Sequence, residues 1–158
     1  MALYAAYHQD ARNKATHFVG VPMIVLSLLI PLGWLRFGPV SAGMILAAAL
    51  IVYYVLLDVP LGLAMLAVFA GLLWAGESIA RLGALTAWAW FGVLFVGGWI
   101  LQLVGHVYEG RRPALADNLF QIFVAPIFLC AELFFALGYK PQLHAAVQAR
   151  AAQLRAST

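Results

Sequence analysis

Charged side chains are scarce in this sequence, making up 9% of its 158 residues. Hydrophobic residues make up 65%, and the mean hydropathy of +0.95 lies well above that of soluble domains, which are about half apolar. A water-soluble fold of this length could not hide so much apolar surface, so the composition predicts a protein whose solvent is lipid. The few basic residues are scattered rather than clustered with aromatics, which argues against nucleic acid as a partner.

Cysteine is nearly absent, because Cys130 is the only one and lies in an apolar run. No internal disulfide can form, and a cysteine-based zinc site is excluded. We interpret Cys130 as a small core residue. The sequence also lacks a phosphate-binding loop, a nucleophile elbow and a dinucleotide fingerprint, which removes several common enzyme classes.

Long apolar segments dominate what is present, each close to the roughly 20 residues that a helix needs to cross a bilayer. They cover 17–35, 39–57, 60–76, 84–108 and 119–138. The sequence therefore predicts an all-α integral membrane helical bundle, a single domain over 1–158 with four spans. The fifth segment either crosses or turns back near Ala125-Pro126. The first 16 residues are too polar for a cleavable signal, so we expect the first segment to remain as an anchor.

The tail over 139–158 is polar enough to leave the bilayer. Leu143, Val147 and Leu154 are spaced to share one face of a helix, and Arg150 and Arg155 are expected to face water. If the fifth segment turns back, the basic tail joins the N-terminal face and marks it as cytoplasmic. If it crosses, the basic tail joins the opposite face, and the number of Lys and Arg residues no longer distinguishes the two faces.

Three histidines lie at the ends of apolar segments. His8 and His17 precede and begin the first segment, and His106 closes the fourth, with Glu109 three residues further on. Alternating crossings bring all four side chains to the same membrane face. Ionisable groups at the membrane edge are energetically expensive, so several together indicate a site.

Helical spacing adds two polar neighbours to this group. Gln102, His106 and Glu109 share one helical face, and Asn13 lies one turn before His17. His8 and His17 are nine residues apart and would lie on opposite sides of one straight helix, so both reach one site only if the chain bends between them.

Each of these residues also has a purely structural interpretation. Glu109 could pair with Arg111 or Arg112 at a solvated helix end. Asp58, also on the histidine face, could cap the third segment or serve the site. Glu132 is embedded in an apolar run and needs a partner or a proton.

Imidazoles with a carboxylate suit Fe(II), Zn(II) or Mn(II), and two or three histidines with one carboxylate resemble the ligand set of non-haem iron oxygenases. The residues alone leave other classes open. A small membrane carrier or lipid-binding protein without catalysis fits the intramembrane Glu132 beside Pro126. A zinc-dependent membrane hydrolase fits the same ligands.

Several short motifs occur together in a fixed order over about residues 4–139. They are Tyr7-His8, Asn13, His17, Gly20 and Pro22, then Gln102, Gly105-His106, Glu109 and Pro113-Ala114, then Ala125-Pro126, Phe128 and Glu132. In these motifs the chain resembles the 2-hydroxy fatty acid dioxygenases, integral membrane enzymes of fatty acid α-oxidation.

The resemblance implies an Fe(II)-dependent enzyme that uses O2 to cleave a 2-hydroxy long-chain fatty acid between carbons 1 and 2, leaving an acid one carbon shorter. It implies membrane lipid as the surroundings, in the inner membrane of a bacterium or the endoplasmic reticulum of a eukaryote. It also implies histidine ligands, which would be His8, His17 and His106. From the position of the predicted face we expect Glu109 to be a fourth ligand or to orient a histidine, and Asn13 and Gln102 to be further catalytic residues. The cations expected to attract the substrate carboxylate are Arg12, Lys14, Arg111 and Arg112.

Overall fold

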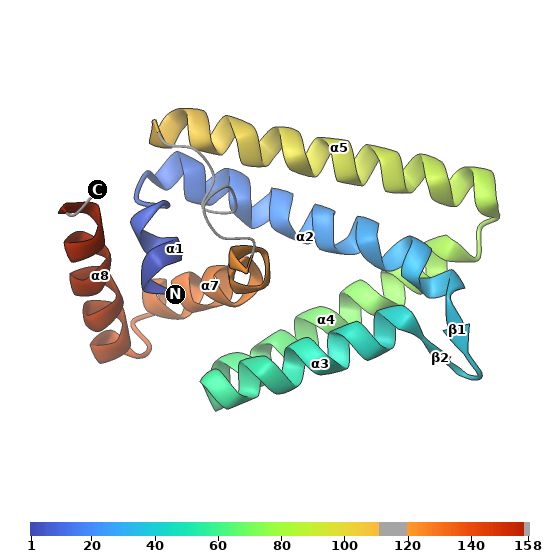
Figure 1. Cartoon of the computed structure of the whole chain (residues 1–158), viewed down its shortest axis with the longest axis horizontal. Coiled ribbons are helices and arrows are strands. Elements are labelled where there is room, and N and C mark those ends of the chain that lie inside the picture. Colours follow the sequence, from blue (N-terminus) through green and yellow to red (C-terminus); the bar gives the residue numbers. More distant parts are fainter. Residues whose placement is uncertain (111–119, 157–158) are drawn as a thin grey trace. The chain divides into compact units, whose positions relative to one another are not determined.

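A computed structural model describes residues 1–110 and 120–156 of the chain, and these residues are almost entirely helical (Figure 1). This confirms the predicted all-α class. The helices are α1 (Ala2–Ala6), α2 (Ala11–Trp34), α3 (Ala42–Leu57), α4 (Val59–Ala80), α5 (Ala84–Glu109), α7 (Gln121–Ala136) and α8 (Pro141–Ala156). A hairpin of two short strands, β1 (Arg36–Phe37) and β2 (Val40–Ser41), joins α2 to α3.

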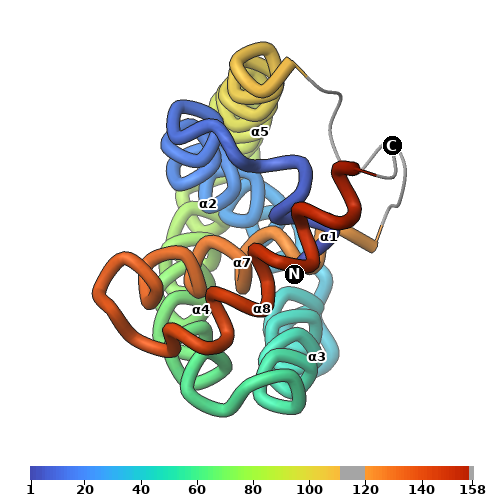
Figure 2. The backbone as a smooth tube through the Cα atoms, turned by 90° about the vertical axis from the view of Figure 1, so that its left-hand side faces the viewer, coloured from blue at the N-terminus to red at the C-terminus, as the bar shows by residue number. Residues whose placement is uncertain are grey.

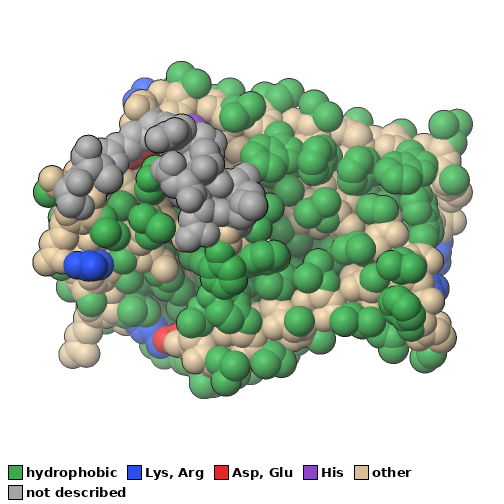
Figure 3. Space-filling model, viewed as in Figure 1, with side chains coloured by type: hydrophobic (Ala, Val, Ile, Leu, Met, Phe, Trp, Pro, Cys, Tyr) green, Lys and Arg blue, Asp and Glu red, His purple; other side chains and the backbone are tan. Residues whose placement is uncertain are grey.

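Three helices in the described part of the chain, α2, α4 and α5, are long and apolar enough to cross a membrane. The apolar helices α3 and α7 have 16 residues each, fewer than the roughly 20 that a straight crossing needs. Large apolar side chains on α3, α4 and α5 are mostly exposed, such as Leu56, Trp74 and Val107. Figure 3 shows hydrophobic side chains over most of the visible face, as expected of a surface that contacts lipid.

The fifth apolar segment does not turn back at Pro126. Helix α7 continues through this proline to Ala136, so the break considered for Ala125-Pro126 is absent. A proline removes one helical hydrogen bond, and a membrane helix tolerates this where neighbouring groups compensate.

The chain divides into two compact units, a terminal unit formed by Met1–Phe18 and Gln102–Thr158, and a middle unit formed by Val19–Leu101. In the middle unit, α3 and α4 pack side by side (Figure 1). Asp58 turns the chain between them by accepting a hydrogen bond from the backbone N–H of Leu61 at 3.1 Å, which confirms the capping interpretation of this residue. A side chain at Gly62 would lie 2.6 Å from Val55, so only glycine allows this close approach.

The terminal unit contains α1, the start of α2, the end of α5, α7 and α8. Helix α8 lies beside α1, as Figure 2 shows. The buried residues of α1 are Tyr4, Ala5 and Ala6, and those of α8 are Val147 and Ala151. The tail is therefore a packed helix, and it contacts α1, the helix that precedes His8.

Candidate metal centre

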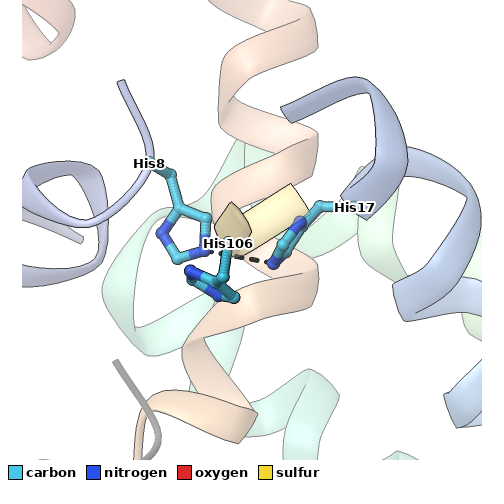
Figure 4. A group of neighbouring side chains, drawn as sticks. All are labelled: His8, His17 and His106. Atoms are coloured by element: carbon cyan, nitrogen blue, oxygen red, sulfur yellow. Dashed lines mark hydrogen bonds between the residues drawn. The ribbon is translucent and has the colours of Figure 1, made fainter. Parts of the chain in front are cut away.

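The three histidines singled out in the sequence meet inside the terminal unit (Figure 4). His8 comes from the connection between α1 and α2, His17 from the second turn of α2, and His106 from the last turn of α5. All three are buried, and one ring nitrogen from each lies within 4.8 Å of the others. Residues almost 100 positions apart in the sequence therefore form one potential metal-binding group.

The bend that this arrangement requires lies between His8 and His17. Helix α1 ends at Ala6, and α2 begins at Ala11. The connection between the two helices turns the His8 ring towards the first turns of α2, where it packs against the His17 ring at a centroid distance of 4.6 Å.

Backbone hydrogen bonds fix which ring nitrogens face the centre of the group. Nδ1 of His8 lies 2.7 Å from the carbonyl oxygen of Tyr4, and Nδ1 of His17 lies 2.9 Å from that of Asn13. A carbonyl oxygen only accepts, so each Nδ1 carries the ring hydrogen and donates it. Each Nε2 of the neutral rings then carries a lone pair, as in most metal-bound histidines.

These two lone pairs face each other, since Nε2 of His8 and Nε2 of His17 are 3.1 Å apart. Burial, together with the neighbouring His17, lowers the pKa of His8 to about 3, so this ring is neutral at physiological pH. Two acceptors at this distance need a cation between them. Nitrogen ligands lie about 2.0–2.1 Å from a metal such as zinc, and two of them on one ion are roughly 3 Å apart. The donor set therefore fits a divalent metal ion.

His106 completes the group through a close approach of α5 to α2. Its ring centroid lies 5.0 Å from that of His8 and 5.1 Å from that of His17. The preceding residue, Gly105, makes this possible. A Cβ at Gly105 would overlap Thr16 Oγ1 and lie 2.5 Å from Asn13 Oδ1.

Glu109 is almost fully buried, with 2% of its side chain exposed, and its hydrogen bonds join the two chain ends of the terminal unit. Its Oε2 accepts from the backbone N–H groups of Gln9 at 2.9 Å and Asp10 at 2.8 Å, and from the Asn13 amide at 3.2 Å. Its Oε1 accepts from Arg155 at 3.0 Å. Glu109 therefore orders the connection that carries His8, whereas no oxygen of it belongs to the group of metal-binding atoms.

Arg155 was not recognised in the sequence as part of this region, and instead of facing water freely its side chain is 33% exposed and hydrogen-bonded within the unit. Its guanidinium donates to Glu109 and, at 3.1 Å, to the carbonyl oxygen of Ala6. Helical spacing is the sequence feature that could have indicated its position. Val147, Ala151 and Arg155 recur every four residues and so share the face of α8 that packs against α1.

Two of the four predicted carboxylate-binding cations lie in the described part of the chain, and each is paired. Arg12 forms an ion pair with Asp10 at 2.9 Å and lies over the ring of Tyr108. Lys14 pairs with Glu132. Arg111 and Arg112 lie outside the described residues, so the alternative that they pair with Glu109 stays a prediction.

Gln102 and Asp58 belong to different units of the chain. Gln102 is buried in the terminal unit, one helical turn before His106, and its Nε2 has no hydrogen-bond partner within the described residues. Asp58 belongs to the middle unit, where it caps α4.

The ion pair of Lys14 with Glu132 supplies the partner that this embedded carboxylate needs. Nζ lies 2.7 Å from Oε2, and both side chains are mostly buried. Because removal of one partner leaves the other charge uncompensated, we expect Glu132→Ala to destabilise the protein by about 1.5–3 kcal/mol, the range for a hydrogen bond to a charged group. Thermal unfolding in detergent measures this.

The double variant Lys14→Met with Glu132→Met provides the control, because it removes both charges together. It should recover most of the lost stability. If Glu132→Ala unfolds at the same temperature as the unchanged protein, the pair does not contribute to stability.

Taken together, the fold and the site define a helical protein with membrane-length apolar helices and a buried three-histidine group at the ends of two of them. Comparison with known proteins places it more closely. The family model described as "2-hydroxy-palmitic acid dioxygenase Mpo1-like" matches residues 1–137, so the chain belongs to the Mpo1-like family.

One curated relative extends this match over nearly the whole chain. The 2-hydroxy-palmitic acid dioxygenase MPO1 of Saccharomyces cerevisiae is 36% identical over 154 residues, which cover 94% of this chain and 85% of the yeast protein. No solved structure matches the chain. The resemblance stated from the sequence motifs is therefore confirmed at the level of the family.

Proposed function

We propose that this protein is an Fe(II)-dependent dioxygenase that cleaves 2-hydroxy long-chain fatty acids with O2 and leaves a fatty acid one carbon shorter. The observation that carries the proposal is the convergence of two Nε2 lone pairs, 3.1 Å apart, with a third buried histidine, in a member of a dioxygenase family. For a substrate R–CH(OH)–COOH and one O2, the balance of atoms gives R–COOH, carbon dioxide and water.

The ion would be held by His8, His17 and His106, which are neutral nitrogen ligands of the kind that Fe(II) accepts. Bound iron would supply the redox chemistry through which O2 reacts with an otherwise unreactive acid. The carbonyl oxygens of Tyr4 and Asn13 keep the hydrogen of two rings on Nδ1, and so keep Nε2 of His8 and His17 available as ligands.

Several nearby side chains would position the substrate head group. The buried Nε2 of Gln102 would donate to the carboxylate or the 2-hydroxyl group. Arg12 has 67% of its side chain exposed against 21% for Lys14, so Arg12 is the more accessible of these two cations for the carboxylate. Arg111 and Arg112 remain further candidates for the same role.

The apolar helices suit the rest of the substrate. A long alkyl chain dissolves in the bilayer, and its carboxylate and 2-hydroxyl stay at the lipid–water boundary. The histidine group lies at the first turns of α2 and the last turn of α5, two helices of membrane-crossing length. A substrate could therefore present its head group to the histidines while its tail stays in lipid.

The proposal predicts that detergent-purified protein loaded anaerobically with Fe(II) converts 2-hydroxypalmitate to the C15 acid after O2 is admitted. One O2 should be consumed for each acid formed, as an oxygen electrode and mass spectrometry of the lipid would measure. Palmitate, which lacks the 2-hydroxyl, and Zn(II)-loaded protein serve as controls and should give no product. Formation of the C15 acid without O2, or equal turnover with Zn(II), would contradict the proposal.

A further inference from the structure

Glu109 connects the segment of His8 to the helix of His106. Its carboxylate accepts hydrogen bonds from two backbone N–H groups, those of Gln9 and Asp10, which directly follow His8. Glu109 itself follows His106 by less than one helical turn. One carboxylate therefore sets the distance between two of the three histidine-bearing segments.

A carboxylate with 2% of its side chain exposed needs a compensating charge. Arg155 supplies it from α8, with Nη1 3.0 Å from Glu109 Oε1. The same Nη1 donates to the carbonyl oxygen of Ala6 at 3.1 Å, just before His8. Arg155 thus binds the chain just before His8 directly. Through Glu109 it also acts on the chain just after His8.

A second contact from α8 reaches the same connection. The Gln9 side chain donates to Gln148 Oε1 at 3.3 Å, and Gln148 lies on α8 two turns before Arg155. Helix α8 therefore touches the connection through both of these residues, while Val147 and Ala151 are buried on the face of α8 that packs against α1.

We propose that Arg155 is a positioning residue for the histidine group, and that α8 holds the His8 segment at the geometry the metal needs. The inference rests on the proposed function, since it takes the histidines to be metal ligands. Helix α8 lies beyond residues 1–137, which the family model matches, so this role is additional to what family membership implies. Loss of Arg155 removes the cation that pairs with Glu109 among the described residues, and so weakens the hold of Glu109 on Gln9 and Asp10.

Binding of Co(II), a spectroscopic probe for the iron site, tests this in the full chain purified in detergent. We expect Arg155→Met to weaken Co(II) binding about 10–100-fold, the usual effect of losing an outer-shell partner, and to change the visible spectrum of the bound ion. Arg155→Lys keeps the positive charge and should restore part of the affinity. The matched control is Arg150→Met on the same helix, where the arginine is exposed and donates to Gln153, and it should bind Co(II) normally.

Hydrogen exchange in the metal-free protein gives an independent measurement. The backbone N–H groups of Gln9 and Asp10 should exchange faster in Arg155→Met than in Arg150→Met, while circular dichroism shows the same helix content in both. The double variant Arg155→Met with Glu109→Gln should bind Co(II) no more weakly than the worse of the two single variants, because the two residues act through one contact.

The outcomes separate the two proposals. If the unchanged protein binds neither Fe(II) nor Co(II), the proposed function fails, and the exchange rates of Gln9 and Asp10 alone decide whether α8 orders this segment. If Arg155→Met binds Co(II) as tightly as the unchanged protein, or leaves those exchange rates unchanged, the positioning role is overturned.

Discussion

Replacement of His106 by alanine is expected to abolish Fe(II) binding and turnover of 2-hydroxypalmitate. The substitution removes one of the three proposed nitrogen ligands, and in the described part of the chain no other histidine, cysteine or carboxylate has a ligand atom in the group. The loss in metal affinity should exceed the 10–100-fold effect of an outer-shell partner. Metal analysis after gel filtration and the assay of the C15 acid measure the two effects.

His144→Ala is the matched control for this experiment. His144 lies on α8 in the same unit, stacked on Phe135 at a centroid distance of 4.6 Å, and it is not a member of the metal-binding group. This variant should retain iron and activity. A His106→Ala protein that still carries one iron per chain and forms the C15 acid would show that the ligands lie elsewhere.

The second large effect is expected from the smallest possible change, Gly105→Ala. A Cβ at this position would overlap the Thr16 hydroxyl and lie 2.5 Å from Asn13 Oδ1 and 3.1 Å from Nδ1 of His17. All three atoms belong to the first turns of α2, so the end of α5 must move away from them. We expect a loss of Co(II) affinity of 100-fold or more, together with a fall in thermal stability of about 1–3 kcal/mol for an overpacked contact.

Gly92→Ala, in the same helix, separates this effect from helix propensity. No heavy atom lies within 4 Å of a Cβ built at Gly92, so alanine there should leave metal binding unchanged and stabilise α5 slightly. If both alanine variants bind Co(II) with the affinity of the unchanged protein, α2 and α5 approach each other less closely at Gly105 than the structure indicates.

The parts of the fold that depend on local chemistry could be predicted from the sequence. Apolar length located the helices, and Asp58 followed by Pro60 located the turn between α3 and α4. Alternation of the apolar segments predicted that His8, His17 and His106 reach the same membrane face, and the structure brings their ring nitrogens together. The need for a chain bend between His8 and His17 also followed from helical geometry alone.

Contacts between residues far apart in the sequence could not be predicted in this way. Glu109 accepts a hydrogen bond from the backbone of Gln9, 100 positions away, and another from Arg155, which periodicity placed on the water-facing side of its helix. Periodicity reports which residues share a face of one helix, but it does not say what that face packs against. The same limit applies to Lys14 and Glu132, since the sequence showed only that the carboxylate needed a partner.

The spacing of the histidines along the chain has a consequence for biosynthesis. His17 leaves the ribosome 89 residues before His106 (106 − 17 = 89). At about 5–20 residues per second, the early histidines wait several seconds or more for the third. On the proposed function, a metal held by all three histidines can bind only after α5 has been made, and Arg155 is made later still. Slow delivery of that metal would leave chains that already carry all three histidines with an unfilled centre.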